Sequence, residues 1–246
     1  METFALSPIG RIQTVFKTKF GVPRQPGLHS TSAWIELFPQ FQPELSLQGF
    51  ERFSHVWVIY RFHLNGAGSF HAKVHPPRLE GQSLGVFATR SPHRPNSLGL
   101  SVCRILEIQP RGLVVEGLDA VDGSPVFDLK PYLPEVEAIS TATGSLGLNP
   151  VVEVTWSEQA RLDVEFWKKR KPDLRCEKLV EEVLSLDPRP RVYRGYEESS
   201  EKPYRSLHRV YLDDVDVHFS FVKTNLVRVE RIVPVDLSQH LDNPMR

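Results

Sequence analysis

The sequence predicts a mainly β protein, with a small closed β-barrel in its first part and a small α+β domain after it. Short strand-like runs without regular helices between them occupy most of the first 130 residues. Such strands close into a barrel more readily than they form βαβ units. Gly66-Ala67-Gly68 lacks the third glycine of a G-x-G-x-x-G motif, which argues against a Rossmann sheet. After Trp156 the apolar residues repeat at helical spacing instead.

Seven segments of the first part are expected to be strands, because each is rich in Val, Ile or aromatic residues and is bounded by Pro or Gly. In chain order they are residues 7–16, 33–38, 54–62, 83–88, 100–108, 112–118 and 126–129. This number of short strands is sufficient for a closed barrel.

A second domain is expected to begin near residue 157, so the chain divides into 1–156 and 157–246. Leu162, Phe166 and Trp167 have helical spacing between residues 158 and 170 and are expected to face the core. A second helix is expected over 173–186, with Asp173 as its N-cap. Residues 210–221 alternate as one strand, and 225–233 suggest its partner.

The composition indicates a soluble globular protein. The chain has 246 residues, 40% of them hydrophobic, which is enough to bury a normal core. We expect no signal peptide and no membrane span, because no apolar run is long enough. Cys103 and Cys176 lie far apart and outside any C-x-x-C motif, which favours the cytoplasm. No two histidines have metal-ligand spacing with an acidic partner, so no metal site is expected.

Charge is distributed unevenly, although the net charge is zero. Between residues 61 and 104 the only acid is Glu80, and four histidines are interleaved with six basic residues: Arg61, Lys73, Arg78, Arg90, Arg94 and Arg104. A basic segment in a neutral protein is expected if one face meets phosphates. The alternative is a solvated surface without a partner.

Residues 85–101 form the most informative segment, because two arginines, a histidine and two prolines lie between strand-like runs. Pro92 and Pro95 fix φ and favour an extended backbone before them, so Arg90 and Arg94 are carried on a stiff loop. Such a loop favours binding, although a braced turn with solvated arginines is the simpler interpretation.

A second loop, residues 119–134, carries an acid, a base and a tyrosine close together. Asp122-Gly123 marks a tight turn. Alternation along an extended backbone places Asp128, Lys130 and Tyr132 on one side. They could form a site, or a surface ion pair beside a half-buried tyrosine.

Together, ATRSPHRPNSLGLS, DGSPVFDLKPYLP and the early VPRQPG resemble the TsaA family, also called TrmO or YaeB, over about the first 155 residues. The resemblance implies a non-Rossmann β-barrel enzyme that uses S-adenosylmethionine. It also implies methyl transfer to N6 of the threonylcarbamoyl-modified adenosine beside the tRNA anticodon. A homodimer with the cofactor near the interface is implied as well.

The resemblance carries cofactor binding to these matching positions: Pro23, Arg24, Gln25, His63, Leu64, Arg90, Leu100, Asp128, Leu129, Lys130 and Pro131. The acceptor of the amine proton is left open among Tyr132, Asp128 and a backbone carbonyl near Pro131. The target base must leave its stack to react, and Tyr132 or His93 could stack on it.

Residues 187–193, DPRPRVY, resemble a signature of the C-terminal domain of bacterial members. Guanidinium and aromatic groups alternate there, a pattern that suits single-stranded RNA. The expected RNA-binding residues are Arg94, Arg189, Arg191, Tyr193 and Arg194. The same sequence also fits a polar turn before a strand.

Two other classes of function remain open. A module that binds S-adenosylmethionine or RNA without chemistry would carry the same basic segment. A β-barrel hydrolase or a small-molecule methyltransferase is the third possibility, but the sequence shows no nucleophile–base pair for hydrolysis.

Overall fold

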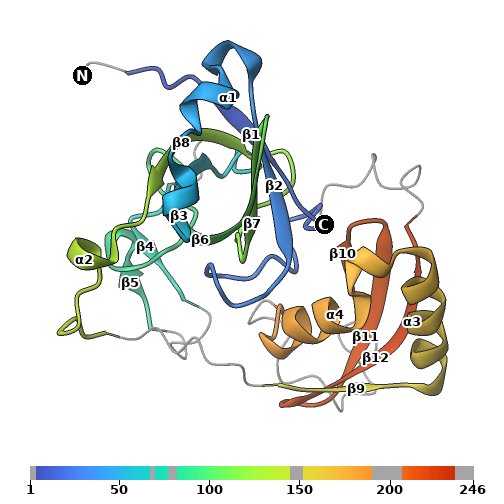
Figure 1. Cartoon of the computed structure of the whole chain (residues 1–246). Coiled ribbons are helices and arrows are strands. Elements are labelled where there is room, and N and C mark those ends of the chain that lie inside the picture. Colours follow the sequence, from blue (N-terminus) through green and yellow to red (C-terminus); the bar gives the residue numbers. More distant parts are fainter. Residues whose placement is uncertain (1–3, 67–69, 77–81, 145–151, 190–206, 236–246) are drawn as a thin grey trace. The chain divides into compact units, whose positions relative to one another are not determined.

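The structure, a computed structural model, describes residues 4–66, 70–76, 82–144, 152–189 and 207–235. Contacts divide the chain into two compact units. The first unit contains Met1–Val15 and Val22–Asn149, and the second contains Phe16–Gly21 and Pro150–Arg246. The predicted fold class is confirmed, because the first unit is a closed barrel and the second joins helices to a sheet (Figure 1).

Six strands close the barrel in the order β1-β2-β7-β6-β3-β8, and every neighbouring pair is antiparallel. Their bounds are β1 Gly10–Gln13, β2 Ser32–Leu37, β3 His55–Arg61, β6 Leu98–Gln109, β7 Gly112–Glu116 and β8 Pro125–Pro131. Alternate side chains point inward and are fully buried, among them Ile12, Ile35, Val58, Leu113 and Val126. The barrel interior is therefore a packed apolar core.

The fourth predicted strand, residues 83–88, does not join the barrel. Its first part is β5, Leu84–Gly85, which pairs with β4, Lys73–Val74, in a separate two-stranded sheet. Its second part is a 3₁₀ turn, Val86–Ala88, in which only Val86 is buried. The apolar run looked like a strand, but Phe87 and Ala88 face solvent.

Short helical segments lie between the barrel strands. They are the 3₁₀ turns η1 Pro39–Phe41 and η2 Phe50–Arg52 and the single-turn helices α1 Pro43–Ser46 and α2 Pro134–Glu137. The turn η1 follows β2, and α2 follows β8, so both lie beyond strand ends.

The antiparallel order gathers four loops at one end of the barrel. We call them the end loops: residues 22–31, 62–65, 86–97 and 117–124. They precede β2, follow β3, precede β6 and join β7 to β8, respectively. Residues far apart in the sequence are thereby brought to the same barrel end.

The second unit contains a sheet in the order β10-β11-β12-β9, with β9 parallel to β12. The strands are β9 Glu153–Trp156, β10 Leu207–Leu212, β11 Val215–Lys223 and β12 Leu226–Pro234. The expected single strand over 210–221 is wrong, because it is a hairpin whose turn residue Asp213 has φ of 56°. The expected domain boundary lay after residue 156, whereas the second compact unit includes the chain from Pro150 onward. Strand β9 belongs to it because it pairs with β12.

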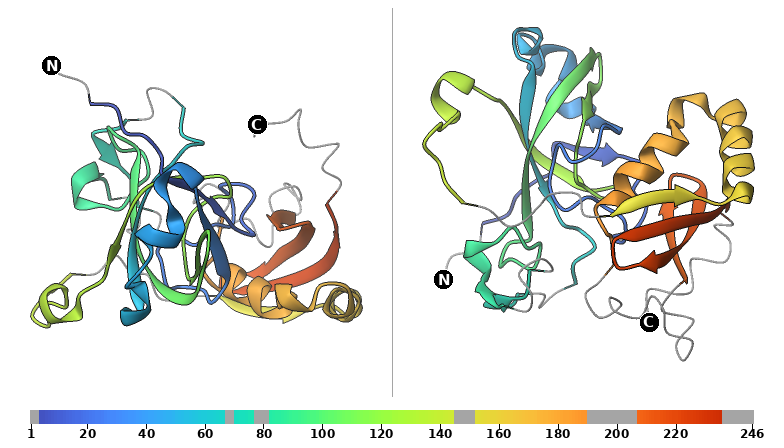
Figure 2. Two further views of the ribbon diagram at one scale, coloured as in Figure 1. Left: turned by 45° about the horizontal axis from the view of Figure 1, so that its top comes forward. Right: turned by 90° about the horizontal axis from the view of Figure 1, so that it is seen from below.

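Two helices belong to this sheet, α3 Glu158–Arg170 and α4 Cys176–Ser185 (Figure 2). The bounds of α3 are as predicted. The expected N-cap Asp173 is wrong, because residues Pro172–Leu174 form a 3₁₀ turn and Arg175, with φ of 45°, precedes α4.

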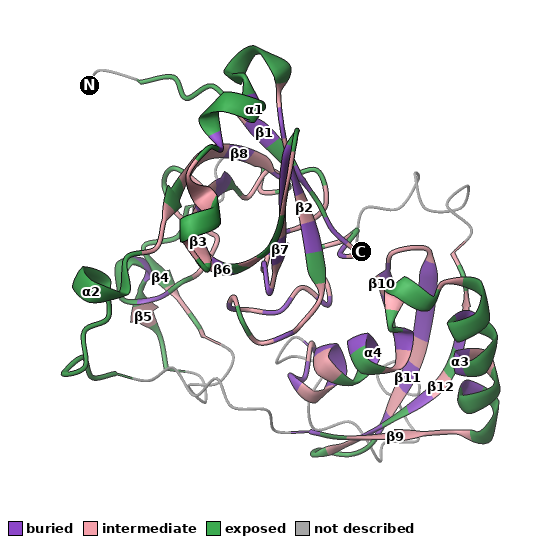
Figure 3. Cartoon of the chain, in the orientation of Figure 1, coloured by how far each residue is buried: buried purple, intermediate pink, exposed green. Residues whose placement is uncertain are grey.

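The buried side of α3 also differs from the prediction. Its buried residues are Ala160, Val164 and Trp167, whereas Leu162 and Phe166 are exposed (Figure 3). The prediction is confirmed for Trp167 and wrong for Leu162 and Phe166, because small Ala160 and Val164 complete the buried stripe instead.

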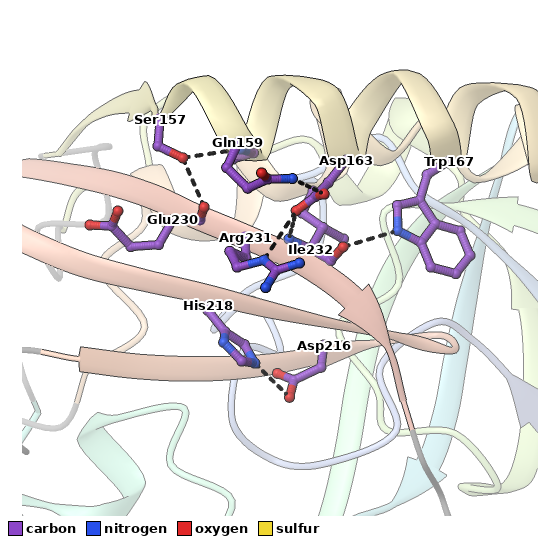
Figure 4. Close-up of polar contacts among 10 residues, drawn as sticks. Ser157, Gln159, Asp163, Trp167, Asp216, His218, Glu230, Arg231 and Ile232 are labelled. Carbon is purple, nitrogen blue, oxygen red and sulfur yellow. Dashed lines mark hydrogen bonds and ion pairs between the residues drawn. The ribbon is translucent and has the colours of Figure 1, made fainter.

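Helix α3 runs along the edge of β12 beyond the end of β9 (Figure 4). Asp163 Oδ2 accepts from the Ile232 backbone N–H at 2.9 Å, and Trp167 Nε1 donates to the Ile232 carbonyl at 3.3 Å. Side chains thus satisfy the open backbone groups of an edge strand and block further strand pairing. In the described part of the chain, no helix has the length and apolar content needed to span a bilayer.

Candidate functional site

Hydrogen bonds tie the end loops together and bring three groups of predicted cofactor residues to one place. Gly27 N–H donates to the Gly117 carbonyl at 2.9 Å, and Asn65 Nδ2 donates to the Pro92 carbonyl at 2.8 Å. Arg90 donates from one terminal nitrogen to Gln25 Oε1 at 2.7 Å. The fold therefore joins the 22–31 and 86–97 loops through residues that sequence reasoning had selected separately.

The 86–97 loop is held rigid mainly by its own hydrogen bonds. Thr89 Oγ1 donates to the Val86 carbonyl at 2.8 Å. One terminal nitrogen of Arg94 donates to the Thr89 carbonyl at 2.9 Å and to the Val86 carbonyl at 3.3 Å. The stiffness expected from the prolines is thus reinforced by Arg94, which braces its own loop as well as carrying charge.

The Arg90 side chain has a position suited to anion binding. The residue is exposed, while its partner Gln25 is buried. Gln25 Nε2 in turn donates to the Arg24 carbonyl, so the amide is oriented from both ends. An oriented neutral acceptor holds the guanidinium without cancelling its charge, which leaves Arg90 able to bind a carboxylate.

His63 lies in the same group with its ring orientation set by Ser124. The His63 Nδ1 and the Ser124 Oγ are 3.1 Å apart. Burial and the nearby charge of Arg61 lower the pKa of His63 below its ordinary value of 6.5, against a smaller opposing effect of Asp122. The imidazole is therefore neutral at pH 7, which suits a neighbour that carries positive charge. Leu64, the next residue, is exposed.

Asp119 is a residue at the end loops that sequence reasoning missed. Its Oδ1 accepts from Ser101 Oγ at 2.5 Å and from the Tyr60 hydroxyl at 3.4 Å. Burial raises the pKa of Asp119, and the charge of Arg90 acts in the opposite direction. A Cβ at Gly99 would lie 2.4 Å from the Tyr60 ring, so glycine is needed beside this network. No local pattern marks Asp119, because its partners come from two distant strands.

The remaining predicted cofactor residues lie along β8 and β6. Asp128 and Leu100 both pair with Ile59 across the outer surface of β3. The Lys130 ammonium is 3.9 Å from the Asp128 carboxylate, and both side chains are about half exposed or more. Leu129 instead packs against the barrel core, so its side chain points inward. We call Leu100, Asp128 and Lys130 the outer-face group.

Tyr132 lies just beyond the end of β8 and packs against the first residues of β3. Its ring centroid is 6.0 Å from that of Trp57 and 6.3 Å from that of His55. Pro131, the last residue of β8, pairs with Val56. Because β3 is a seven-residue strand, a length of roughly 20 Å separates its two ends. Tyr132 and His63 therefore lie at opposite ends of the barrel within one chain.

Arg189 in the second unit does not have the exposed position expected of an RNA-binding residue. Its side chain is 1% exposed, and its Nε lies 2.9 Å from Asp187 Oδ1. The guanidinium also lies 3.1 Å from the ring centroid of Phe221. This arginine is a core residue, neutralised by a buried acid. The other three predicted residues, Arg191, Tyr193 and Arg194, lie outside the described residues.

Neither cysteine is a candidate for reaction, because Cys103 and Cys176 are both buried and unpaired. Burial raises the pKa of both thiols. Among the described residues, no three His, Cys, Asp or Glu side chains gather as a metal site.

Comparison with known proteins agrees with this architecture. Residues 11–138 match the tRNA-methyltransferase O N-terminal domain, and residues 149–235 match the TrmO C-terminal domain. The tRNA (adenine(37)-N6)-methyltransferase of Escherichia coli is 37% identical over 228 residues, covering 89% of this chain and 94% of that protein. An S-adenosyl-L-methionine-binding protein of Archaeoglobus fulgidus is 39% identical over 139 residues, covering 56% of this chain and 96% of its own length.

A crystal structure of TrmO superposes with a TM-score of 0.76 at 36% identity, covering 94% of this chain and all of that one. Both domain models match in the expected order, and the similarity extends over nearly the whole length. The chain therefore belongs to the TrmO family.

Proposed function

We propose that this protein is an S-adenosylmethionine-dependent tRNA methyltransferase that modifies N6 of the threonylcarbamoyladenosine beside the anticodon. The observation that carries the proposal is the contact between Arg90 and Gln25 beside neutral His63 at the end of the barrel. The sequence resemblance assigns these residues to cofactor binding, and a relative that is matched over 94% of its length is named for this reaction. A cytoplasmic location follows from the tRNA substrate.

The residues of the end loops fit the chemical groups of S-adenosylmethionine. Arg90 would bind the carboxylate, and the backbone of Pro23, Arg24 and Gln25 offers polar groups next to it. His63 is neutral and so does not repel the sulfonium. When bound, the cofactor supplies the methyl group and leaves as a neutral thioether.

The contribution of the chain to this displacement is mainly orientation. The lone pair of the adenine amine is delocalised into the ring, so the amine must be held in line with the methyl group. An acceptor that receives the amine proton would help as the new bond forms. Tyr132, Asp128 and a backbone carbonyl near Pro131 remain the candidates.

We further propose that the protein acts as a homodimer. In one chain the outer-face group lies on β6 and β8, and Tyr132 lies beyond the end of β8 that is far from the end loops. A second copy could place its outer-face group over the end loops of the first and so complete the cofactor site. The exposed Leu100 and the partly exposed Ile59 lie on this surface, and apolar side chains of this kind form the core of subunit interfaces.

The second unit is proposed to contact tRNA through the segment that contains Arg191, Tyr193 and Arg194. The alternation of guanidinium and aromatic groups in the sequence supports this role. Arg189 is left out of the proposed surface because its charge is buried against Asp187.

The test is transfer of labelled methyl groups from S-adenosylmethionine to bulk tRNA from a strain that lacks the endogenous enzyme. We expect the labelled methyl groups to appear in the acid-insoluble fraction, which contains the tRNA, and to be released from it by nuclease treatment. Cofactor binding without turnover would favour a binding module instead. Labelling of a nuclease-resistant small acceptor would favour a small-molecule methyltransferase.

A further inference from the structure

The most exposed aromatic ring at the end loops belongs to Phe87, which neither the cofactor positions nor the RNA-binding prediction includes. Phe87 is 74% exposed, although it lies between buried Val86 and the hydrogen-bonded residue Thr89. Leaving a phenyl ring in water forgoes a substantial burial energy. A single exposed apolar side chain is common on protein surfaces, but the groups that hold and surround this ring distinguish it.

The ring is held in place by the same arginine that braces the loop. The guanidinium carbon of Arg94 lies 5.7 Å from the Phe87 ring centroid, within the range of a cation–π contact. Arg94 is itself bound to the carbonyls of Val86 and Thr89. The ring therefore has a supported position without being covered.

The surroundings of the ring favour a nucleic acid over a protein partner. Residues 70–76 and 82–94 contain Lys73, Arg90 and Arg94, together with three histidines, and no acid. The Val86 N–H donates to the Ala72 carbonyl at 3.0 Å, which holds the 70–76 segment beside the loop. An exposed aromatic ring among basic side chains is the usual arrangement for stacking an unpaired base.

The two stacking candidates expected from the sequence have less suitable positions. The His93 ring is partly buried and packs edge-on against His71, with centroids 5.7 Å apart. Tyr132 packs against Trp57 at the opposite end of β3. Phe87 is three residues from Arg90 in a hydrogen-bonded loop, so their Cα atoms lie within about 10 Å of each other. A base on Phe87 would thus be held by the same loop that carries Arg90.

We propose that the Phe87 ring is a stacking platform for a nucleobase of the RNA substrate, held in position by Arg94. This inference rests on the proposed function only in taking RNA as the substrate. Stacking requires a flat π face, so the contribution should follow the shape of the side chain and not its hydrophobicity alone.

The test measures binding of an unmodified RNA stem–loop with the sequence of a tRNA anticodon arm. Phe87→Ala and Phe87→Leu should each bind it about 5- to 150-fold more weakly, whereas Phe87→Trp should bind within a few-fold of wild type. The slope of log affinity against log salt should stay unchanged, because no phosphate contact is lost. Phe41→Ala is the matched control, since Phe41 is an exposed phenylalanine in a 3₁₀ turn at the other end of the barrel.

Three results would overturn the proposal. Wild-type RNA affinity in Phe87→Leu would show a merely apolar contact. Loss of S-adenosylmethionine binding in Phe87→Ala would assign the ring to the cofactor pocket, and a changed oligomeric state would assign it to a second copy of the chain. The proposed function fails separately, if wild-type protein binds the stem–loop and tRNA but transfers no methyl group.

Discussion

Arg90 has a specific role at the residue scale, because a neutral side chain orients it and no acid is bonded to it in the described part of the chain. Gln25 holds one of its terminal nitrogens at 2.7 Å. Arg104 also carries a positive charge, but it lies 3.5 Å from the Glu116 carboxylate on the barrel surface and is less available to a ligand. A cofactor carboxylate can therefore be bound by Arg90 without displacing a salt bridge.

Replacing Arg90 with Ala should weaken S-adenosylmethionine binding by about 1.5–3 kcal/mol, the usual contribution of a hydrogen bond to a charged group. Isothermal titration calorimetry measures the effect, and Arg104→Ala should leave affinity unchanged. Equal affinity of folded Arg90→Ala and wild-type protein would remove Arg90 from the cofactor site.

The His63 side chain predicts a pH dependence of cofactor binding. Its pKa is lowered, so the ring is neutral above that pKa and becomes a cation as the pH falls through it. The cation would repel the sulfonium, and affinity should then fall by up to about tenfold for each further pH unit. Titrations between pH 5 and 7.5 should show this loss in wild type and a flat profile in His63→Gln. The same acid loss in both proteins would exclude His63 as its cause.

Asp119 predicts an effect of pH on stability. Since burial raises its folded pKa above the ordinary value of 3.8, the folded state holds a proton that the unfolded state releases. The contribution of Asp119 to the free energy of unfolding is fully present at a pH below its ordinary pKa of 3.8. It is lost as the pH rises through the raised pKa of the folded state. Asp119→Asn keeps an acceptor for Ser101 and Tyr60 but cannot ionise. Its Tm relative to wild type should therefore be more favourable at pH 7 than at pH 4; a difference independent of pH would contradict the account.

At the scale of elements, periodicity predicted what local sequence determines. The bounds of α3 follow from its helical spacing, and Ser157 caps it by accepting from the Ala160 N–H at 3.0 Å. Most barrel strands were found because runs rich in Val, Ile and aromatic residues are also a local signal. The hairpin at Asp213 was missed because alternation continues through a tight turn that an aspartate can form with positive φ.

The site was predictable where a motif contains it and not where distant elements build it. Arg90 and Gln25 were selected from separate motifs, and the fold brings them into contact. Arg189 is buried against Phe221, a residue of β11 that lies far away in the sequence, so the local sequence could not reveal it. Asp119 was missed because Tyr60 and Ser101 give it its environment.

Helix α3 is expected to stabilise the second sheet by satisfying the edge of β12. Asp163→Ala removes the acceptor of the Ile232 N–H and should destabilise the protein by about 1–3 kcal/mol. Glu165→Ala is the control, because it removes only an exposed ion pair with Lys168 and should cost about 0.5 kcal/mol or less. Chemical denaturation measures both variants. Similar midpoints for the two would show that the edge contact contributes little.

At the scale of the whole molecule, the two groups of proposed cofactor residues predict a site shared between the subunits of the proposed dimer. The end loops hold Arg90, and the outer-face group contains Lys130. In a shared site, an Arg90→Ala chain and a Lys130→Ala chain can complement each other, because a mixed dimer has one site in which both residues are intact.

At S-adenosylmethionine concentrations too low to saturate the variants, each single variant should transfer little methyl, and an equal mixture after subunit exchange should regain about one quarter of wild-type methyl transfer, as random pairing of C₂ dimers gives. The control is Arg90→Ala protein alone, taken through the same exchange procedure. No recovery from a mixture that light scattering shows to be dimeric and exchanged would place both residues in a single chain's site.

The central claim is that the protein methylates N6 of threonylcarbamoyladenosine in tRNA. The most direct measurement digests tRNA after reaction and identifies the labelled nucleoside by chromatography and mass spectrometry. The account predicts a single labelled product, threonylcarbamoyladenosine with one added methyl group on N6, formed by wild-type protein and strongly reduced with Arg90→Ala. Label on another nucleoside, or on no nucleoside while S-adenosylmethionine and tRNA both bind, would contradict it.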